Sequence, residues 1–146
     1  MAKTYISTDA DLSCLDTVNG SVEKFLVDCS CPGKVMMQIL VSVEEVFVNV
    51  ANYAYEPEEE KAARYCKVEL ESGMEEHAGW VRIVISDGGK PFDPLKRDKP
   101  DISLSADERE IGGLGIHMVR TIMDEISYEY KDSQNILTMV KRWNIS

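Results

Sequence analysis

Two polar side chains, Glu45 and Asn49, lie within a mostly apolar stretch over residues 35–54. Spaced four residues apart, they project from the same face of a helix, one turn from each other. A carboxylate in such a place can accept a proton from a hydroxyl group or a water molecule, and an amide oxygen is a hard ligand suited to Mg2+. Buried polar groups need partners, so the pair is either functional or structural, with hydrogen bonds to nearby backbone.

A second candidate lies where an apolar strand ends on Asp87 and two glycines turn the chain away. An aspartate at the carboxyl end of a buried strand can accept a hydrogen bond from an exocyclic amine such as that of adenine. The adjacent Gly89 lets a flat ring approach the backbone closely. The alternative is an ordinary turn without a ligand.

The third candidate is the run Gly112, Gly113, Leu114 and Gly115, which leads into an amphipathic helix. The free amides of a helix start, together with the helix dipole, attract anions such as phosphates. The run lacks the third glycine of a dinucleotide-binding loop and the Gly-Lys-Ser or Gly-Lys-Thr of a P-loop. The alternative is a glycine-rich helix cap.

The elements that must position these residues follow from apolar periodicity. Spacings of three and four predict helices, and alternation predicts strands. Asp11 or Ser13 is the candidate N-cap of the first helix, and the last two strands form a hairpin that turns at Asp132-Ser133. We expect helices over 12–27, from Pro32 to about Tyr53, and over 113–125, and strands over 3–8, 64–71, 79–86, 126–131 and 135–143. The order β-α-α-β-β-loop-α-β-β predicts a single domain over 1–146. Its fold class is an α/β (α+β) two-layer sandwich, with three helices on one face of a mixed, mainly antiparallel sheet.

Composition limits the partners. The 146 residues carry a formal net charge of -10 and a pI near 4.6, which disfavours nucleic acid and anionic membrane surfaces. The apolar stretch over 35–54 is interrupted by Gln38, Glu44, Glu45, Asn49 and Asn52, so we do not expect a membrane span. Four cysteines without metal-ligand spacing suggest reduced thiols, and we therefore expect a cytoplasmic protein.

Taken in this order, the three candidates resemble the N, G1 and G2 boxes of the GHKL (Bergerat-fold) ATPases, closest to the stand-alone anti-sigma-factor serine/threonine kinases. The resemblance is carried by Glu45-Val-Phe-Val-Asn49 followed by Ala54-Tyr55, by Asp87-x-Gly89-x-x-Phe92-Asp93, by Gly-Gly-Leu-Gly-Ile-His over 112–117 and by Asn135-Ile-Leu-Thr-Met-Val-Lys141. Two positions depart from the family pattern. Tyr53 stands where relatives often have His, and Pro91 stands where a second G1 glycine is common.

The resemblance implies roles for particular residues. Glu45 would be the general base for the acceptor hydroxyl, and Asn49 would bind Mg2+. Asp87 would read adenine, with Thr138 as its helper through a shared water, and Gly89 would make room for the ring.

The same resemblance places the phosphates of ATP on the backbone of Gly112, Gly113, Leu114 and Gly115. Residues 93–111 would form the ATP lid. The implied cofactors are ATP and Mg2+.

The implied function is that of an ATP-dependent protein-serine/threonine kinase that acts as an anti-sigma factor. It would phosphorylate a STAS-domain anti-anti-sigma protein, sequester a sigma factor or another regulator, and form a homodimer. The alternative is an ATP-binding partner-switch module without significant kinase activity. The presence of Glu45 favours the kinase, because a protein that only binds ATP has no need of that carboxylate.

Overall fold

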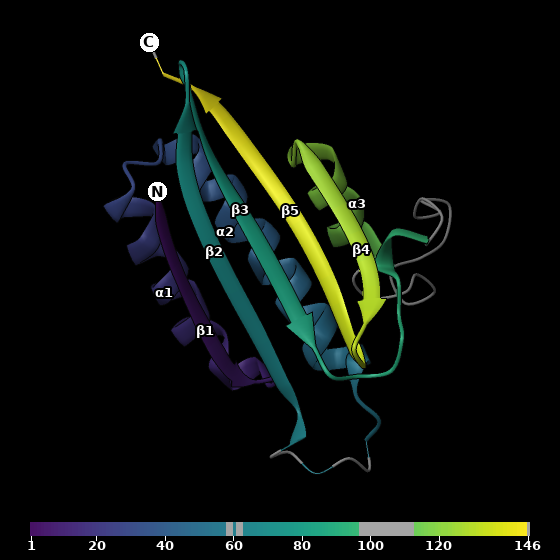
Figure 1. Ribbon diagram of the computed structural model, residues 1–146. Helices are drawn as coiled ribbons and strands as arrows, with labels where there is room; N and C mark the ends of the chain where they lie inside the picture. The colour runs from purple at the N-terminus through teal and green to yellow at the C-terminus, as the bar shows by residue number, and fades with distance from the viewer. Residues whose placement is uncertain (58–59, 61–62, 97–112, 146) are drawn as a thin grey trace.

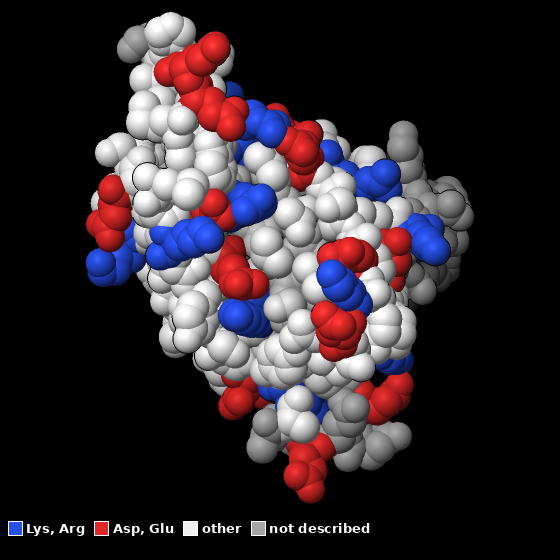
Figure 2. Space-filling model, viewed as in Figure 1, with Lys and Arg blue, Asp and Glu red and all other residues white. Residues whose placement is uncertain are grey.

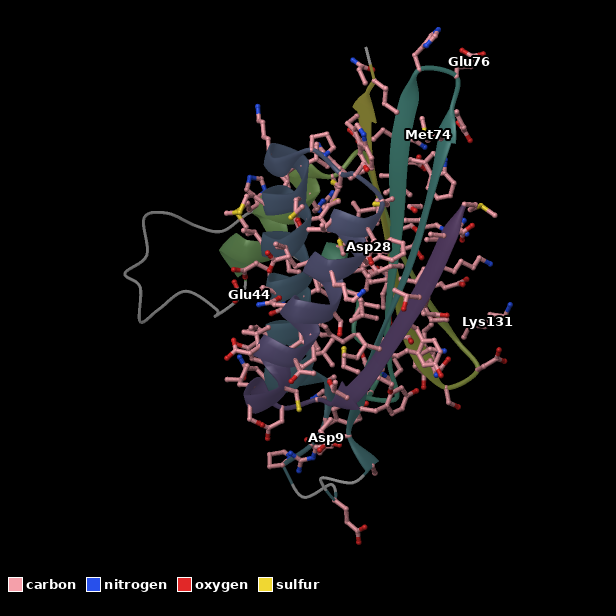
Figure 3. All side chains as sticks on the ribbon, turned by 90° about the vertical axis from the view of Figure 1, so that its left-hand side faces the viewer. Asp9, Asp28, Glu44, Met74, Glu76 and Lys131 are labelled. Carbon is pink, nitrogen blue, oxygen red and sulfur yellow. The ribbon has the colours of Figure 1, made fainter. Side chains whose placement is uncertain are left out.

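The structure is a computed structural model and describes residues 1–57, 60, 63–96 and 113–145. It has two layers, a five-stranded sheet and three helices that cover one of its faces (Figure 1). Seen edge-on, Asp28 and Glu44 belong to the helical layer, and Met74 and Glu76 mark one end of the sheet (Figure 3). The predicted two-layer fold is confirmed.

The sheet is formed by β1 (Ala2–Asp9), β2 (Tyr65–Glu75), β3 (Ala78–Asp87), β4 (Glu125–Lys131) and β5 (Gln134–Asn144). Their order across the sheet is β1-β2-β3-β5-β4. All four pairings between them are antiparallel, so the expectation of a mixed sheet is wrong in this respect. On the face without helices, basic and acidic side chains are interspersed (Figure 2).

The first helix, α1 (Leu15–Asp28), follows a 3-10 turn (Leu12–Cys14). Asp11 caps that turn, as predicted, because its carboxylate accepts a hydrogen bond from the amide of Ser13 at 2.9 Å. The four buried residues of α1 (Val18, Val22, Phe25 and Leu26) recur at spacings of three and four, so one face of the helix packs on the core.

The central helix, α2 (Gly33–Asn49), begins directly after Pro32 and continues as a π-helical turn (Val50–Ala54). By length and apolar composition alone, the segment Gly33–Ala54 could cross a membrane. Its apolar residues are instead accounted for by the core, since Ile39, Val43 and Phe47 are fully buried. A central core helix of this kind satisfies the same criteria as a membrane span.

The last helix, α3 (Gly113–Ile122), is shorter than the predicted 113–125. The amide of Asp124 already donates to the carbonyl of Val140 at 2.9 Å, and Glu125 pairs with Val140 in the sheet. The helix therefore ends three residues earlier than the apolar pattern indicates, and β4 begins one residue earlier.

The β4–β5 hairpin turns at Asp132 and Ser133, as predicted. Both have positive φ, 54° and 62°, the combination that fits the twist of a two-residue hairpin turn. The turn fixes the register of the two strands and so places Asn135 opposite Tyr130 on one side and Asp87 on the other.

Candidate functional site

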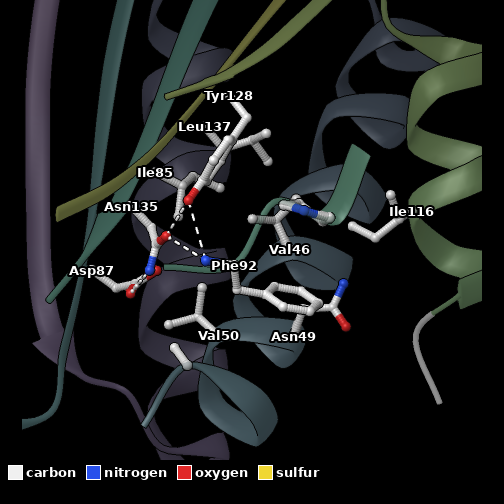
Figure 4. A pocket seen from close by; sticks show the side chains of 12 residues that line it. Val46, Asn49, Val50, Ile85, Asp87, Phe92, Ile116, Tyr128, Asn135 and Leu137 are labelled. Carbon is white, nitrogen blue, oxygen red and sulfur yellow. Dashed lines mark hydrogen bonds between the residues drawn. The ribbon is translucent and has the colours of Figure 1, made fainter. Parts of the chain in front are cut away.

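A pocket opens between the end of α2 and the strand ends of β3 and β5 (Figure 4). Its lining is largely apolar and includes Val46, Val50, Ile85, Ile116 and Leu137. The polar side chains in it come from four elements: Asn49, Asp87, Tyr128 and Asn135. An apolar cleft with a few convergent polar groups is the usual form of a small-molecule site.

Asp87 is the last residue of β3 and is only 5% exposed. Its Oδ1 accepts two hydrogen bonds at 2.9 Å, from the amide of Gly89 and from Nδ2 of Asn135. Its Oδ2 has no hydrogen-bond partner among the described residues, and this oxygen is not fully buried. Oδ2 is therefore the oxygen that a ligand in the pocket can reach.

The pKa of the Asp87 carboxyl is raised, because burial penalises the charged form. The hydrogen bonds from Asn135 and Gly89 act in the opposite direction and favour the ionised carboxylate. A carboxylate held in this way at the mouth of an apolar pocket is a strong acceptor for a ligand N–H group.

Asn135, on β5, lies directly opposite Asp87 in the antiparallel pairing and is 6% exposed. Its Nδ2 donates to Asp87 Oδ1 and, at 2.8 Å, to the carbonyl of Lys90. Its Oδ1 accepts from the amide of Phe92 at 3.0 Å and from the Tyr128 hydroxyl. The side chain thus joins the Asp87 carboxylate to the turn that follows β3 (Figure 4).

The prediction that Thr138 assists Asp87 is wrong. Thr138 pairs with Val84, three residues along the two strands from the pair formed by Asp87 and Asn135. Successive side chains alternate between the faces of a strand, so Thr138 lies on the face of the sheet without helices. The sequence did not assign a role to Asn135, because its place opposite Asp87 depends on the register, although its position two residues after the turn at Asp132 and Ser133 could have marked it.

Gly89 is confined by protein backbone. A Cβ atom at this position would overlap the carbonyl of Ala54, the last residue of the π-helical turn. The neighbouring amide of Lys90 donates to that same carbonyl at 3.0 Å. Gly89 therefore permits the turn after Asp87 to lie directly against the end of the central helix.

Tyr55 holds the same turn from the other side. Its hydroxyl accepts hydrogen bonds from the amides of Gly88 at 2.9 Å and Tyr65 at 3.0 Å, and donates to the carbonyl of Tyr65 at 2.5 Å. Burial is the main reason why the pKa of Tyr55 is raised to about 12, so the hydroxyl keeps its proton. One side chain thus ties together the end of the central helix, the start of β2 and the turn after β3.

Asn49 faces the pocket from the last turn of α2 and is 7% exposed. Its Nδ2 is buried and has no hydrogen-bond partner among the described residues. An unsatisfied buried amide is costly, which fits a side chain whose partner is a ligand. Its amide oxygen suits Mg2+, and no group of three or more His, Cys, Asp or Glu among the described residues is placed to hold a metal. A metal at Asn49 would therefore need further oxygen ligands from a nucleotide and water.

Glu45 lies one turn before Asn49 and meets the start of α3. A Cβ atom at Gly115 would overlap the Glu45 carboxylate, so the glycine is what allows the two helices to approach here. The pKa of Glu45 is raised, first by burial and then by the charge of Glu44. The structure thus brings the first and third candidate segments together. Gly113 and Leu114 begin α3, while Gly112 and the lid residues 97–111 lie outside the described part of the chain.

Comparison with known proteins agrees with this geometry. The family of histidine kinase-like ATPase domains matches residues 8–141. The chain is 25% identical over 101 residues to the serine/threonine-protein kinase BtrW of Bordetella bronchiseptica, a match over 69% of this chain and 66% of BtrW.

Among solved structures, the chain resembles the RsbU and RsbW domains of Rv1364c from Mycobacterium tuberculosis. The TM-score is 0.68 with 14% sequence identity, over 99% of this chain and 34% of that one. The match to the family covers all three segments, Glu45 to Asn49, Asp87 to Asp93 and the start of α3. This chain belongs to the histidine kinase-like ATPase family.

Proposed function

We propose that the chain is an ATP-dependent protein-serine/threonine kinase that acts as an anti-sigma regulatory factor in the cytoplasm. The observation that carries this proposal is the placement of Glu45 against Gly115 at the start of α3, one helical turn from the pocket-facing amide of Asn49. A carboxylate is thereby placed beside the region that would receive phosphates, while Asp87 lies deeper, where a base would bind. A protein that only binds ATP has no use for the first of these groups.

Phosphoryl transfer relies mainly on positioning and on neutralising charge. The oxygen of a serine or threonine hydroxyl would attack the γ-phosphorus, and the bond to the β–γ bridging oxygen would break to release ADP. Glu45 would orient the hydroxyl and accept its proton. Asn49 would hold Mg2+, which when bound neutralises charge on the phosphates.

The proposed partners follow the family resemblance and the similarity to BtrW and to the RsbW domain. The phosphorylated protein would be a STAS-domain anti-anti-sigma protein, and the sequestered protein a sigma factor or another regulator. The active form would be a homodimer.

The experiment is incubation with labelled ATP, Mg2+ and a STAS-domain protein from the same genome. Wild type should form phosphoserine or phosphothreonine. Glu45→Gln should lower kcat by about 100-fold or more, the usual contribution of a general base, while ATP affinity by calorimetry stays within about threefold because the change keeps the side chain's shape. Asn49→Ala should weaken Mg-dependent ATP binding.

Glu44→Gln is the matched control, since Glu44 is adjacent in the chain but the atoms nearest to an added Cβ at Gly115 all belong to Glu45. It should retain kinase activity. ATP binding without phosphotransfer in wild type would instead identify the partner-switch module. Absence of Mg-dependent ATP binding in wild type would overturn the whole proposal.

A further inference from the structure

Four hydrogen bonds fix the orientation of the Asn135 side-chain amide, and two of them involve backbone groups of fixed character. The Phe92 amide can only donate, so it must face the Asn135 oxygen at 3.0 Å. The Lys90 carbonyl can only accept, so it must face the Asn135 nitrogen at 2.8 Å. The orientation of an asparagine amide is usually ambiguous, but these two backbone groups remove the ambiguity.

The second hydrogen on Asn135 Nδ2 then points at Asp87 Oδ1, 2.9 Å away. The amide of Gly89 points at the same oxygen. An oxygen that faces two donors cannot carry a proton, so Oδ1 of Asp87 is an acceptor in every state of the carboxyl group. Only Oδ2, the oxygen that the pocket can reach, is left to determine which ligand group Asp87 recognises.

We propose that Asn135 is a specificity-determining residue: together with the Gly89 amide it donates to Asp87 Oδ1 and so favours the ionised carboxylate, whose Oδ2 then accepts in the pocket and selects a purine with an amine at position 6 over one with a carbonyl. The inference rests on the proposed ATP site and adds to it the residue that sets base selectivity. Asn135 acts through Asp87 and has no need to contact the base.

The chemistry of rejection is that of two acceptors facing each other. An amine at position 6 donates to Oδ2, whereas a carbonyl there would leave both oxygens buried without a proton between them. Sites that hydrogen-bond a substrate group discriminate strongly against analogues that cannot make the bond. A single hydrogen bond to a charged group accounts for about 1.5–3 kcal/mol, which corresponds to roughly 10-fold to 150-fold in affinity.

The test compares the affinities of ATP and inosine triphosphate, whose base carries a carbonyl where adenine carries the amine, by calorimetry on the full chain. Wild type should prefer ATP by at least about tenfold. Asn135→Leu should lower that ratio towards one, because only the Gly89 amide then holds Oδ1 and Asp87 is more easily protonated on Oδ2, where the proton can donate to the carbonyl. Asn135→Thr should lower it by less, since a hydroxyl can donate or accept, and this smaller change serves if the leucine variant does not fold.

A second pair of variants isolates the orienting role. In Asp87→Asn, the fixed Nδ2–H of Asn135 forces the new carbonyl towards itself and turns the new NH2 group into the pocket, so the preference should reverse towards inosine triphosphate. In Asp87→Asn combined with Asn135→Leu, only the Gly89 amide still holds the new carbonyl, so the preference for inosine triphosphate should be weaker than in Asp87→Asn alone.

Gln134→Leu is the control. Gln134 is next to Asn135 on β5 but its side chain lies on the other face of the strand, where Nε2 donates to the Tyr65 hydroxyl at 2.6 Å, so the ATP preference should change by no more than about twofold. Equal weakening of both nucleotides in Asn135→Leu and Asn135→Thr, or an unchanged preference in the double variant relative to Asp87→Asn, would show that Asn135 is only structural. A wild type that binds ATP and inosine triphosphate equally would also overturn the inference while leaving the kinase proposal intact, whereas a wild type that binds neither would overturn both.

Discussion

Glu45 and Asn49 share one face of α2 but not one environment. Asn49 is 7% exposed and lines the pocket, whereas Glu45 is only partly buried and meets the start of α3. This difference in exposure within a single helical turn suits two separate roles. The buried neutral amide can hold a metal-bound nucleotide, and the more open carboxylate can be reached by a protein hydroxyl.

Protonation of Glu45 should set the acid limb of kinase activity. Its pKa is raised above the ordinary glutamate value, and a general base works only when ionised, so activity should fall as the pH drops through that raised pKa. We expect the limb in a pH profile of kcat to lie above pH 4.5. Glu44→Gln removes the second cause of the shift and should move the limb to lower pH; a limb that does not move would contradict the assignment.

Gly115→Ala should damage catalysis far more than stability. The added methyl group would displace the end of a flexible side chain, the Glu45 carboxylate, and not backbone. Misplacing a catalytic group by about 1 Å can cost about 100-fold in rate, so kcat should fall by that order while the thermal midpoint changes little.

Gly20→Ala is the control for this change. Gly20 lies within α1 with open space around it, and alanine there should raise the free energy of unfolding by about 0.5–1 kcal/mol without affecting kcat. A Gly115→Ala protein with wild-type kcat would show that Glu45 does not need its observed position.

At the scale of elements, the π-helical turn and Tyr55 connect the central helix to the turn after β3. Tyr55→Phe keeps the ring but deprives two amides and a carbonyl of their partner. Unsatisfied polar groups cost about 1–3 kcal/mol when buried, so denaturant unfolding should show a loss of at least about 1 kcal/mol, together with weaker ATP binding. Tyr5→Phe, at a side chain that is 66% exposed, should leave both unchanged. Equal stability of the two variants would contradict the inference that the Tyr55 hydroxyl holds these elements together.

Elements were predictable from the sequence where one physical pattern determines them. The apolar spacing of α1 and α2, the Asp11 cap and the Asp132–Ser133 turn all depend on local sequence, and the structure confirms them. The early end of α3 depends on the pairing of Glu125 with Val140, which no local pattern contains. The choice of Asn135 over Thr138 likewise depends on which residue of β5 lies opposite Asp87.

At the scale of the whole molecule, an acidic chain has to bind an anion. With a formal net charge of -10, the protein's overall field opposes a nucleoside triphosphate, so binding must come from local groups. Any nucleotide that binds only the folded chain will stabilise the fold. At ATP concentrations 100-fold above Kd, the free energy of unfolding should rise by about 2.7 kcal/mol.

Denaturant titration with and without Mg-ATP measures this effect. Asp87→Asn should abolish most of the increase, because its pocket-facing group becomes a donor and cannot accept from the adenine amine. An unfolding midpoint in wild type that ATP does not move would contradict nucleotide binding by the folded state.

The two-residue turn at Asp132 and Ser133 also restricts where residues can be inserted or deleted in the β4–β5 hairpin. Side chains alternate between the faces of a strand, so inserting or deleting one residue between the turn and Asn135 would exchange the two faces of β5. Asn135 would then point to solvent, and Thr138 would enter the pocket side. A residue added within the turn itself only lengthens the loop and leaves β5 in place. Length changes at this hairpin should therefore preserve function only where they are confined to the turn and Asn135 stays opposite Asp87.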